Sequence, residues 1–152
     1  MSEGYTQLIL EVFSLHQQLL VLGDSLGAPH GLTSARWKVM GGIALSDHAP
    51  TVSQVARKMG LTRQAVQRVC NDLLELGMLK SIDNPKDRRA SCWTLSEQGW
   101  QRYRAVMTSQ QAWIERISHN LDAGALQECT KFLKQFSLSI EEDLNGYINQ
   151  PI

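Results

Sequence analysis

Five polar side chains recur on one face of a helix that the pattern predicts in the middle of the chain. Their spacing alternates between one and three residues, which keeps them on one side of a helix: Arg63, Gln64, Gln67, Arg68 and Asn71. In a major groove, Gln pairs with adenine and Arg with guanine, and either side chain can hold a phosphate instead. This face therefore has the chemistry to bind DNA. The alternative interpretation is a solvent-exposed polar helix face.

A second set of charged residues ends a turn-rich segment, 83–89, and consists of Asp87, Arg88 and Arg89. The negative potential of a narrow minor groove attracts a guanidinium group. A neighbouring carboxylate can orient an arginine, because Arg–carboxylate pairs are often bidentate. These three residues favour a DNA contact, and the alternative is a solvated charged turn, which is what most charge runs are.

Caps and breakers predict two helices that carry the first set. Residues 51–54 match a capping box that opens a short helix to Met59, and Gly60 suits the left-handed turn that ends it. Thr62 caps the next helix, which is expected to run through Leu76. Its apolar face is expected to be buried and consists of Val66, Val69, Cys70 and Leu73.

Two short strands, 78–82 and 90–95, are predicted on either side of the charged turn. Helix, glycine turn, helix and hairpin together make a winged helix-turn-helix lobe, which we place at residues 33–99. The expected fold is mainly α with a small β-hairpin wing, in a single domain covering residues 1–152.

Helices with broad apolar stripes are predicted on both sides of this lobe, at 5–26 and 100–149. The first stripe follows the three-four spacing of a buried helix and contains Leu8, Val12, Leu15, Leu19 and Leu22. We expect these helices to form a homodimer. Residues 23–31 are expected to be an irregular connection, because they contain three glycines and a proline. Thr33 then caps a helix expected over 34–46, where Gly41 and Gly42 suggest a close approach by another helix.

The charges are unevenly distributed along a chain whose net charge is zero. Between Val52 and Arg104 stand ten basic and five acidic residues, whereas the rest of the chain has five basic and ten acidic ones. A basic middle between acidic flanks indicates a local face that binds a polyanion.

Other classes of protein find little support in the sequence. No long apolar run predicts a membrane span, and no signal sequence is visible. The three cysteines are too scattered for a disulfide framework or a zinc site, so a cytoplasmic location is expected. No catalytic motif and no pair of histidines at helical metal-site spacing occurs, so we expect neither an enzyme nor a metal or other cofactor. A winged module that docks a protein instead of DNA remains an alternative.

The sequence resembles the MarR (multiple antibiotic resistance) family of regulators. The segments that carry the resemblance are 31–39, 52–77 and 87–99, and Asp87-Arg88-Arg89 before Leu95-Ser96-Glu97-Gln98-Gly99 is the most specific of them. The resemblance implies a transcription regulator that binds an inverted-repeat operator in double-stranded DNA as a homodimer. It also implies that Arg89 enters the minor groove and that Asp87 holds it in place.

The resemblance further implies a repressor that a small apolar or phenolic effector releases. Four residues are candidates to line its pocket: His16, Trp37, Met40 and Trp113. The alternative for these residues is plain core packing. A redox-responsive regulator without a small-molecule ligand is a second alternative. Some relatives sense oxidants through a cysteine in the first helix, where this chain has none, and we expect Cys70 to serve packing.

Overall fold

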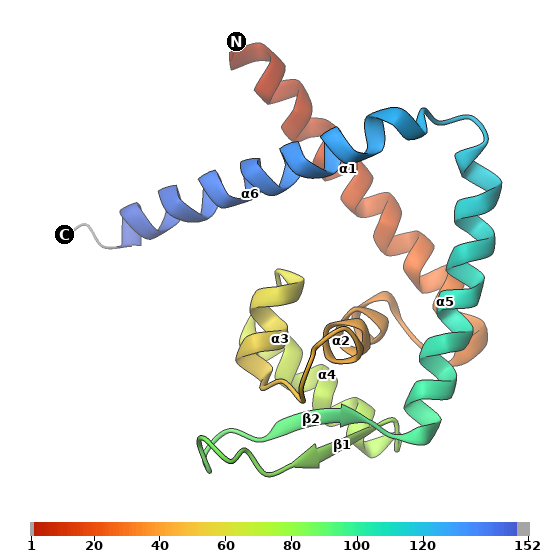
Figure 1. The fold of residues 1–152 in the computed structure, drawn as a ribbon, viewed down its shortest axis with the longest axis vertical. Coiled ribbons are helices and arrows are strands. Elements are labelled where there is room, and N and C mark those ends of the chain that lie inside the picture. The colour runs from red at the N-terminus through yellow and green to blue at the C-terminus, as the bar shows by residue number, and fades with distance from the viewer. Residues whose placement is uncertain (1, 149–152) are drawn as a thin grey trace. The chain divides into compact units, whose positions relative to one another are not determined.

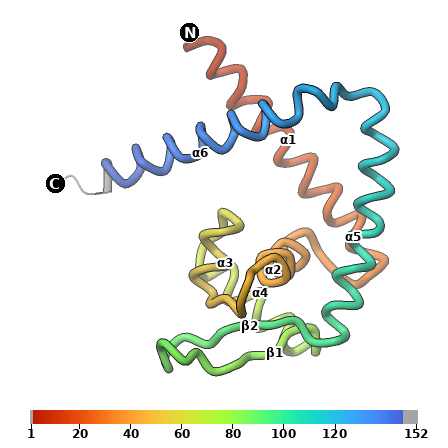
Figure 2. Tube along the Cα trace, in the orientation of Figure 1, coloured from red at the N-terminus to blue at the C-terminus, as the bar shows by residue number. Residues whose placement is uncertain are grey.

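The computed structural model describes residues 2–148. The chain divides into two compact units, Met1–Gln111 and Ala112–Ile152, and each is described by itself. Helix α5 (Glu97–Ser118) begins in the first unit and ends in the second, and its course can be followed along the tube in Figure 2.

The first unit contains the hairpin and most of the helices (Figure 1). Its elements are α1 (Ser2–Gly27), the 3-10 helix η1 (Ala28–His30), α2 (Ser34–Ala44), α3 (Val52–Met59), α4 (Arg63–Glu75), β1 (Leu79–Ile82), β2 (Cys92–Leu95) and the start of α5. The second unit contains the end of α5, the 3-10 helix η2 (Ala123–Ala125) and α6 (Leu126–Ile148). This architecture confirms the predicted mainly α fold with a two-stranded wing.

The hairpin is tied to the helices at its root. Its antiparallel register pairs Leu79 with Leu95 and Ile82 with Cys92. The segment before α3 joins the other edge of β2, because Thr51 forms a bridge with Cys92 and the Trp93 N–H donates to the Pro50 carbonyl at 2.9 Å. The base of the wing is therefore fixed to the start of α3.

One apolar core holds the helices and the hairpin of the first unit together. Its fully buried side chains come from α2, α3, α4, β1 and α5: Val39, Met40, Val55, Val66, Cys70, Leu73, Leu79 and Val106. The buried face predicted for α4 is confirmed, since Val69 is also buried. Burying a large apolar side chain stabilises a fold by about 1.5–3 kcal/mol, so this core fixes the orientation of α4.

The predicted caps are confirmed. Thr51 and Gln54 form a reciprocal capping box at α3, and Thr62 accepts a hydrogen bond from the Ala65 N–H at 3.1 Å. Gly60 ends α3 with φ 64°, in the left-handed region that favours glycine. The expected close approach at Gly42 is also observed, because a Cβ there would lie 2.8 Å from Met59 Cγ in α3.

The predicted helix 5–26 and the predicted irregular connection 23–31 overlap at residues 23–26, and there the helix is confirmed and the irregular connection is wrong. Helix α1 continues through Gly27, and only Ala28–His30 and Gly31 form the turn. Gly23 and Gly27 serve close packing instead, because a Cβ at Gly27 would clash with the Leu32 carbonyl oxygen. The helix tolerates these glycines since tertiary contact outweighs their weak helix propensity.

Other predicted elements extend too far. Helix α2 ends at Ala44 and not at residue 46, and α4 ends at Glu75. Met78 lies outside β1 because its N–H completes the turn after α4, donating to the Leu73 carbonyl at 2.8 Å. Residues 90 and 91 belong to the loop, since the Ala90 N–H donates to the Asp87 carbonyl at 3.2 Å. Asn149, the last residue of the predicted range 100–149, lies outside the described residues.

Candidate nucleic-acid interface

Helix α4 presents a polar face opposite its buried one. All five side chains predicted for that face are exposed: Arg63, Gln64, Gln67, Arg68 and Asn71. Gln67 Nε2 donates a hydrogen bond to Asn71 Oδ1 at 2.9 Å. That bond uses one of the two N–H donors of Gln67 and leaves its Oε1 free to accept. Gln67 thus keeps the donor and the acceptor that a bidentate contact with adenine needs.

A turn at the end of the wing is shaped by Asp87. Its Oδ1 accepts a hydrogen bond from the Arg89 N–H at 2.9 Å, and all three residues from Asp87 to Arg89 are exposed. Asp87 therefore orients Arg89 through the backbone. Within residues 2–148 no ion pair joins the Asp87 carboxylate to a guanidinium group. The bidentate side-chain pair expected from the sequence is replaced by an Asx turn.

An open groove of about 410 Å³ brings α4 and the wing together. It is lined by Arg63, Gln64 and Gln67 from α4, by Arg89, Ala90, Ser91 and Trp93 from the wing, and by Thr51, Val52 and Ser53. Four of the predicted residues thus share one surface, while Arg68, Asn71, Asp87 and Arg88 do not line the groove.

Two exposed hydroxyl side chains of this groove, Ser53 and Ser91, were not predicted from the sequence. Serine hydroxyls are ordinary donors to phosphate oxygens. The available signal for Ser53 is its place in the first turn of α3. No pattern in the sequence points to Ser91, because only the pairing of β2 with Thr51 brings residue 91 next to α3.

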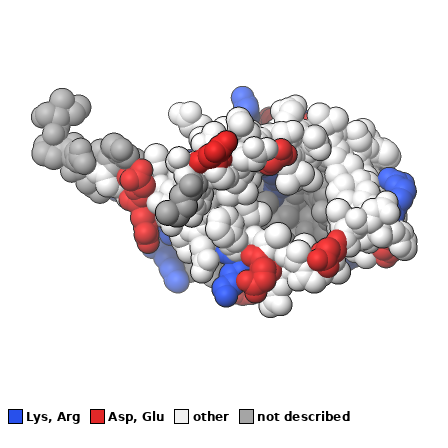
Figure 3. All heavy atoms as spheres, turned by 90° about the horizontal axis from the view of Figure 1, so that it is seen from above, with Lys and Arg blue, Asp and Glu red and all other residues white. Residues whose placement is uncertain are grey.

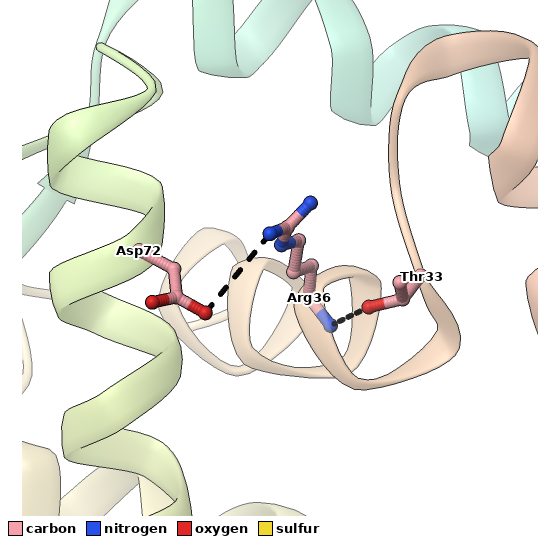
Figure 4. A network of polar contacts seen from close by, with 3 residues as sticks. All are labelled: Thr33, Arg36 and Asp72. Carbon is pink, nitrogen blue, oxygen red and sulfur yellow. Dashed lines mark hydrogen bonds and ion pairs between the residues drawn. The ribbon is translucent and has the colours of Figure 1, made fainter.

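One acidic residue of α4, Asp72, has a basic partner. Asp72, on the side of α4 that faces α2, lies 4.0 Å from an Arg36 guanidinium nitrogen (Figure 4). The face of the molecule in Figure 3 shows charged side chains scattered between uncharged ones, with no continuous basic patch. The surplus of basic residues between Val52 and Arg104 belongs to the segment that contains α3, α4 and the wing.

The residues predicted for an effector pocket have different environments. Met40 is completely buried in the core and Trp37 packs against it. His16 is exposed on α1, and Trp113 is half-buried in the second unit. Packing thus accounts for Met40 and Trp37, and the pocket stays a prediction.

Cys70 is fully buried, and burial raises the pKa of its thiol to about 12. Such a thiol is protonated at neutral pH and is a poor nucleophile.

Among residues 2–148, no three His, Cys, Asp or Glu side chains are grouped to hold a metal ion. In that same range no helix combines the length and apolar character needed to cross a bilayer.

The chain is similar to known proteins along nearly its whole length. A sequence model of the MarR family matches residues 30–90. The uncharacterized protein Rv2011c of Mycobacterium tuberculosis is 33% identical over 143 residues, covering 94% of this chain and 99% of that protein.

Solved structures show the same fold. Mutant MarR from E. coli, complexed with operator DNA, has a TM-score of 0.75 at 20% identity and covers 86% of this chain and 93% of its own. Staphylococcus aureus MarR, in complex with salicylate and kanamycin, has a TM-score of 0.77 at 15% identity. The match covers 91% of this chain and 93% of that chain. The chain belongs to the MarR family, whose members are winged helix-turn-helix transcription regulators.

Proposed function

We propose that this protein is a homodimeric transcription regulator that binds an inverted-repeat operator in double-stranded DNA. The proposed location is the cytoplasm. The groove that joins the polar face of α4 to Arg89 carries this proposal. A helix with its side chains is about 10–12 Å across, which matches a major groove about 12 Å wide. With α4 in the major groove, the hairpin reaches an adjacent minor groove, where Arg89 binds.

Base reading and backbone contact divide among the exposed residues. Gln64 and Gln67 have the donor–acceptor pairs that recognise adenine, and Arg63 and Arg68 recognise guanine or hold phosphates. Ser53 and Ser91 donate to phosphates at the rim of the groove. The neighbour from E. coli was solved with operator DNA, which supports DNA binding by a protein of this fold.

Dimer formation is supported by apolar side chains that neither unit covers by itself. On α1 the exposed ones are Tyr5, Ile9, Leu10, Val12, Phe13, Leu15, Leu19 and Val21, with exposed fractions from 37% to 68%. On α6 they are Leu126, Phe132, Leu133, Leu138, Ile140 and Leu144, from 42% to 68%. An exposed apolar set of this size marks an interaction surface, and the partner that we propose for each helix is a second copy of the chain.

The proposed mode of regulation is repression relieved by a small apolar or phenolic effector. The S. aureus neighbour was solved with salicylate, a phenolic acid, which supports this class of ligand. In this chain Trp37, which is half-buried, is the candidate contact, and its fluorescence reports binding. Saturable quenching by salicylate that disappears in Trp37→Leu supports the pocket. Quenching that persists unchanged when both tryptophans among the candidates, Trp37 and Trp113, are replaced by leucine contradicts it.

Two alternative functions, a redox-responsive regulator without a small-molecule ligand and a module that docks a protein, make different demands on the structure. A redox switch at Cys70 conflicts with its burial and raised pKa. A protein-docking module would not depend steeply on salt, whereas DNA binding releases about 0.9 counterion per phosphate contact.

The test is selection of bound sequences from a random pool of DNA duplexes, followed by affinity measurements at several salt concentrations. We expect an inverted repeat whose half-sites lie about one helical turn, roughly 34 Å, apart. Affinity should fall steeply as salt rises. Recovery of no enriched sequence, together with salt-independent binding, contradicts the proposal.

A further inference from the structure

The junction between α1 and α2 is packed more closely than a flexible linker. A Cβ added to Gly23 would lie 2.7 Å from Ser34 Oγ and 2.9 Å from Ser34 Cβ, both in the first turn of α2. Ser34 itself is buried, with 6% of its surface exposed. At this point α1 therefore touches α2 without room for even a methyl group.

An acidic residue of α1 binds the start of α2. Asp24 Oδ1 accepts a hydrogen bond from the Ser34 N–H at 2.6 Å, and Thr33 Oγ1 accepts one from the Arg36 N–H at 3.2 Å. The α2 N–H groups at this end have no partner within the helix, so both bonds satisfy donors that otherwise lack one. The carboxylate of Asp24 belongs to α1. Its hydrogen bond therefore caps the N-terminus of α2 and also joins the two helices.

The position of Asp24 is unfavourable for α1 alone. It lies in the last turn of α1, a turn without basic residues, where the helix dipole disfavours a negative charge. The positive end of α2 reverses this effect, because the same carboxylate lies at the α2 N-terminus. The placement of Asp24 thus stabilises the junction and not α1.

The junction also contacts two more elements of the first unit. The His30 carbonyl accepts a hydrogen bond from Arg102 Nη1 at 3.4 Å, and His30 Nε2 lies 3.3 Å from Ser109 Oγ, both in α5. Two residues after Ser34, Arg36 pairs with Asp72 of α4 (Figure 4). The partly exposed Arg36–Asp72 pair contributes little by itself, but it shows that α2 links the junction to α4.

We infer that Gly23 and Asp24 are positioning residues that fix the angle between α1 and the winged lobe, and so fix the half-site spacing that the dimer accepts. This inference rests on the proposed function. If α1 is held in the dimer, the angle at the junction sets the distance between the two α4 helices. Symmetry doubles any displacement, so a shift of about 1.7 Å in each lobe changes the separation by about 3.4 Å, one base-pair step.

The experiment uses the inverted repeat that the wild-type protein selects from random duplexes. Four duplexes carry its two half-sites at the selected spacing, at one base pair fewer, and at one and two base pairs more. The readout is the ratio of affinities between the selected spacing and its neighbours, measured with the full-length dimer. A change that only lowers stability or general affinity leaves this ratio unaltered.

Asp24→Ala should reduce the spacing preference by about fivefold, which corresponds to roughly 1 kcal/mol. Asp24→Asn should keep most of it, because the amide oxygen still accepts from the Ser34 N–H and only the favourable charge at the α2 N-terminus is lost. Gly23→Ala should move or flatten the preference, since the added methyl displaces α2. Gly4→Ala in the same helix is the matched control, because a Cβ there meets nothing within 4 Å.

Equal losses of affinity at every spacing in Asp24→Ala and Gly23→Ala overturn the inference while leaving the proposed function intact. Failure of the wild-type protein to bind any duplex overturns both. If Gly23→Ala does not fold, the comparison of Asp24→Ala with Asp24→Asn decides the question, since Asp24 is exposed and the substitution opens no cavity in the core.

Discussion

At the scale of single residues, the wing depends on the bond between the Asp87 carboxylate and the Arg89 N–H. Arg89→Ala should weaken operator binding by at least about tenfold and lower the salt slope by about 0.9 per subunit, with unchanged thermal unfolding. Asp87→Ala should also weaken binding, although removing an acid favours a polyanion electrostatically. Asp87→Asn should bind nearly as the wild type, because its amide oxygen can form the same Asx turn.

These three variants are compared by operator affinity at two salt concentrations. Tighter binding by Asp87→Ala would mean that the wing is only a basic patch. Equal loss in Asp87→Asn and Asp87→Ala would mean that the charge of Asp87, and not its turn, positions Arg89.

Cys70 makes a residue-scale prediction about pH. Its pKa is raised from 9.0 to about 12 in the folded protein, so the unfolded chain ionises first. Rising pH therefore favours unfolding. The stability that the buried, protonated Cys70 thiol contributes is fully present below pH 9 and is lost as the pH approaches 12. The loss should be about 1 kcal/mol between about pH 9 and 10, measured as the difference in unfolding free energy between wild type and Cys70→Ala. A constant difference across that range would contradict the burial of the thiol.

At the scale of elements, α5 packs directly on the backbone at the start of the hairpin. A Cβ at Gly99 would clash with the Met78 carbonyl oxygen, which accepts a hydrogen bond from the Ser96 N–H at 3.0 Å. An alanine in a helix is normally about 0.5–1 kcal/mol better than glycine. Gly99→Ala should instead destabilise the protein by about 1–3 kcal/mol in chemical denaturation, because the backbone must move.

The exposed Gly4 in α1 supplies the matched control, and Gly4→Ala should be neutral or slightly stabilising. If Gly99→Ala were as stable as Gly4→Ala, the contact between α5 and Met78 would not constrain the lobe.

At the scale of the whole molecule, the apolar face of α1 predicts the assembly. Leu15 is 50% exposed in the single chain, and we expect the dimer to bury it. Leu15→Glu should give monomers at micromolar concentration in sedimentation, since a buried unpaired carboxylate is strongly unfavourable. Leu45→Glu, at a lobe residue that is 68% exposed, should stay dimeric. Monomeric wild-type protein, or a dimeric Leu15→Glu variant, would contradict the interface.

Much of this molecule follows from local rules that the sequence carries by itself. The caps at Thr51 and Thr62 and the left-handed turn at Gly60 depend only on residues within a few positions, so the amino-acid pattern is enough to predict them. The polar and apolar faces of α4 follow from the helical period. The family resemblance likewise follows from the sequence alone, because three contiguous segments, 31–39, 52–77 and 87–99, carry it.

Only the tertiary structure decided what depends on contacts between distant segments. Gly23 and Gly27 have the composition of a loop, yet they stay helical because α2 and Leu32 approach them too closely for a side chain. The pairing of Thr51 with Cys92 brings Ser53 and Ser91 to one groove, and no local pattern encodes that pairing. Local hydrogen bonds and periodicity thus fix most of the elements, whereas the steric fit between elements fixes where α1 ends and which polar residues share a surface.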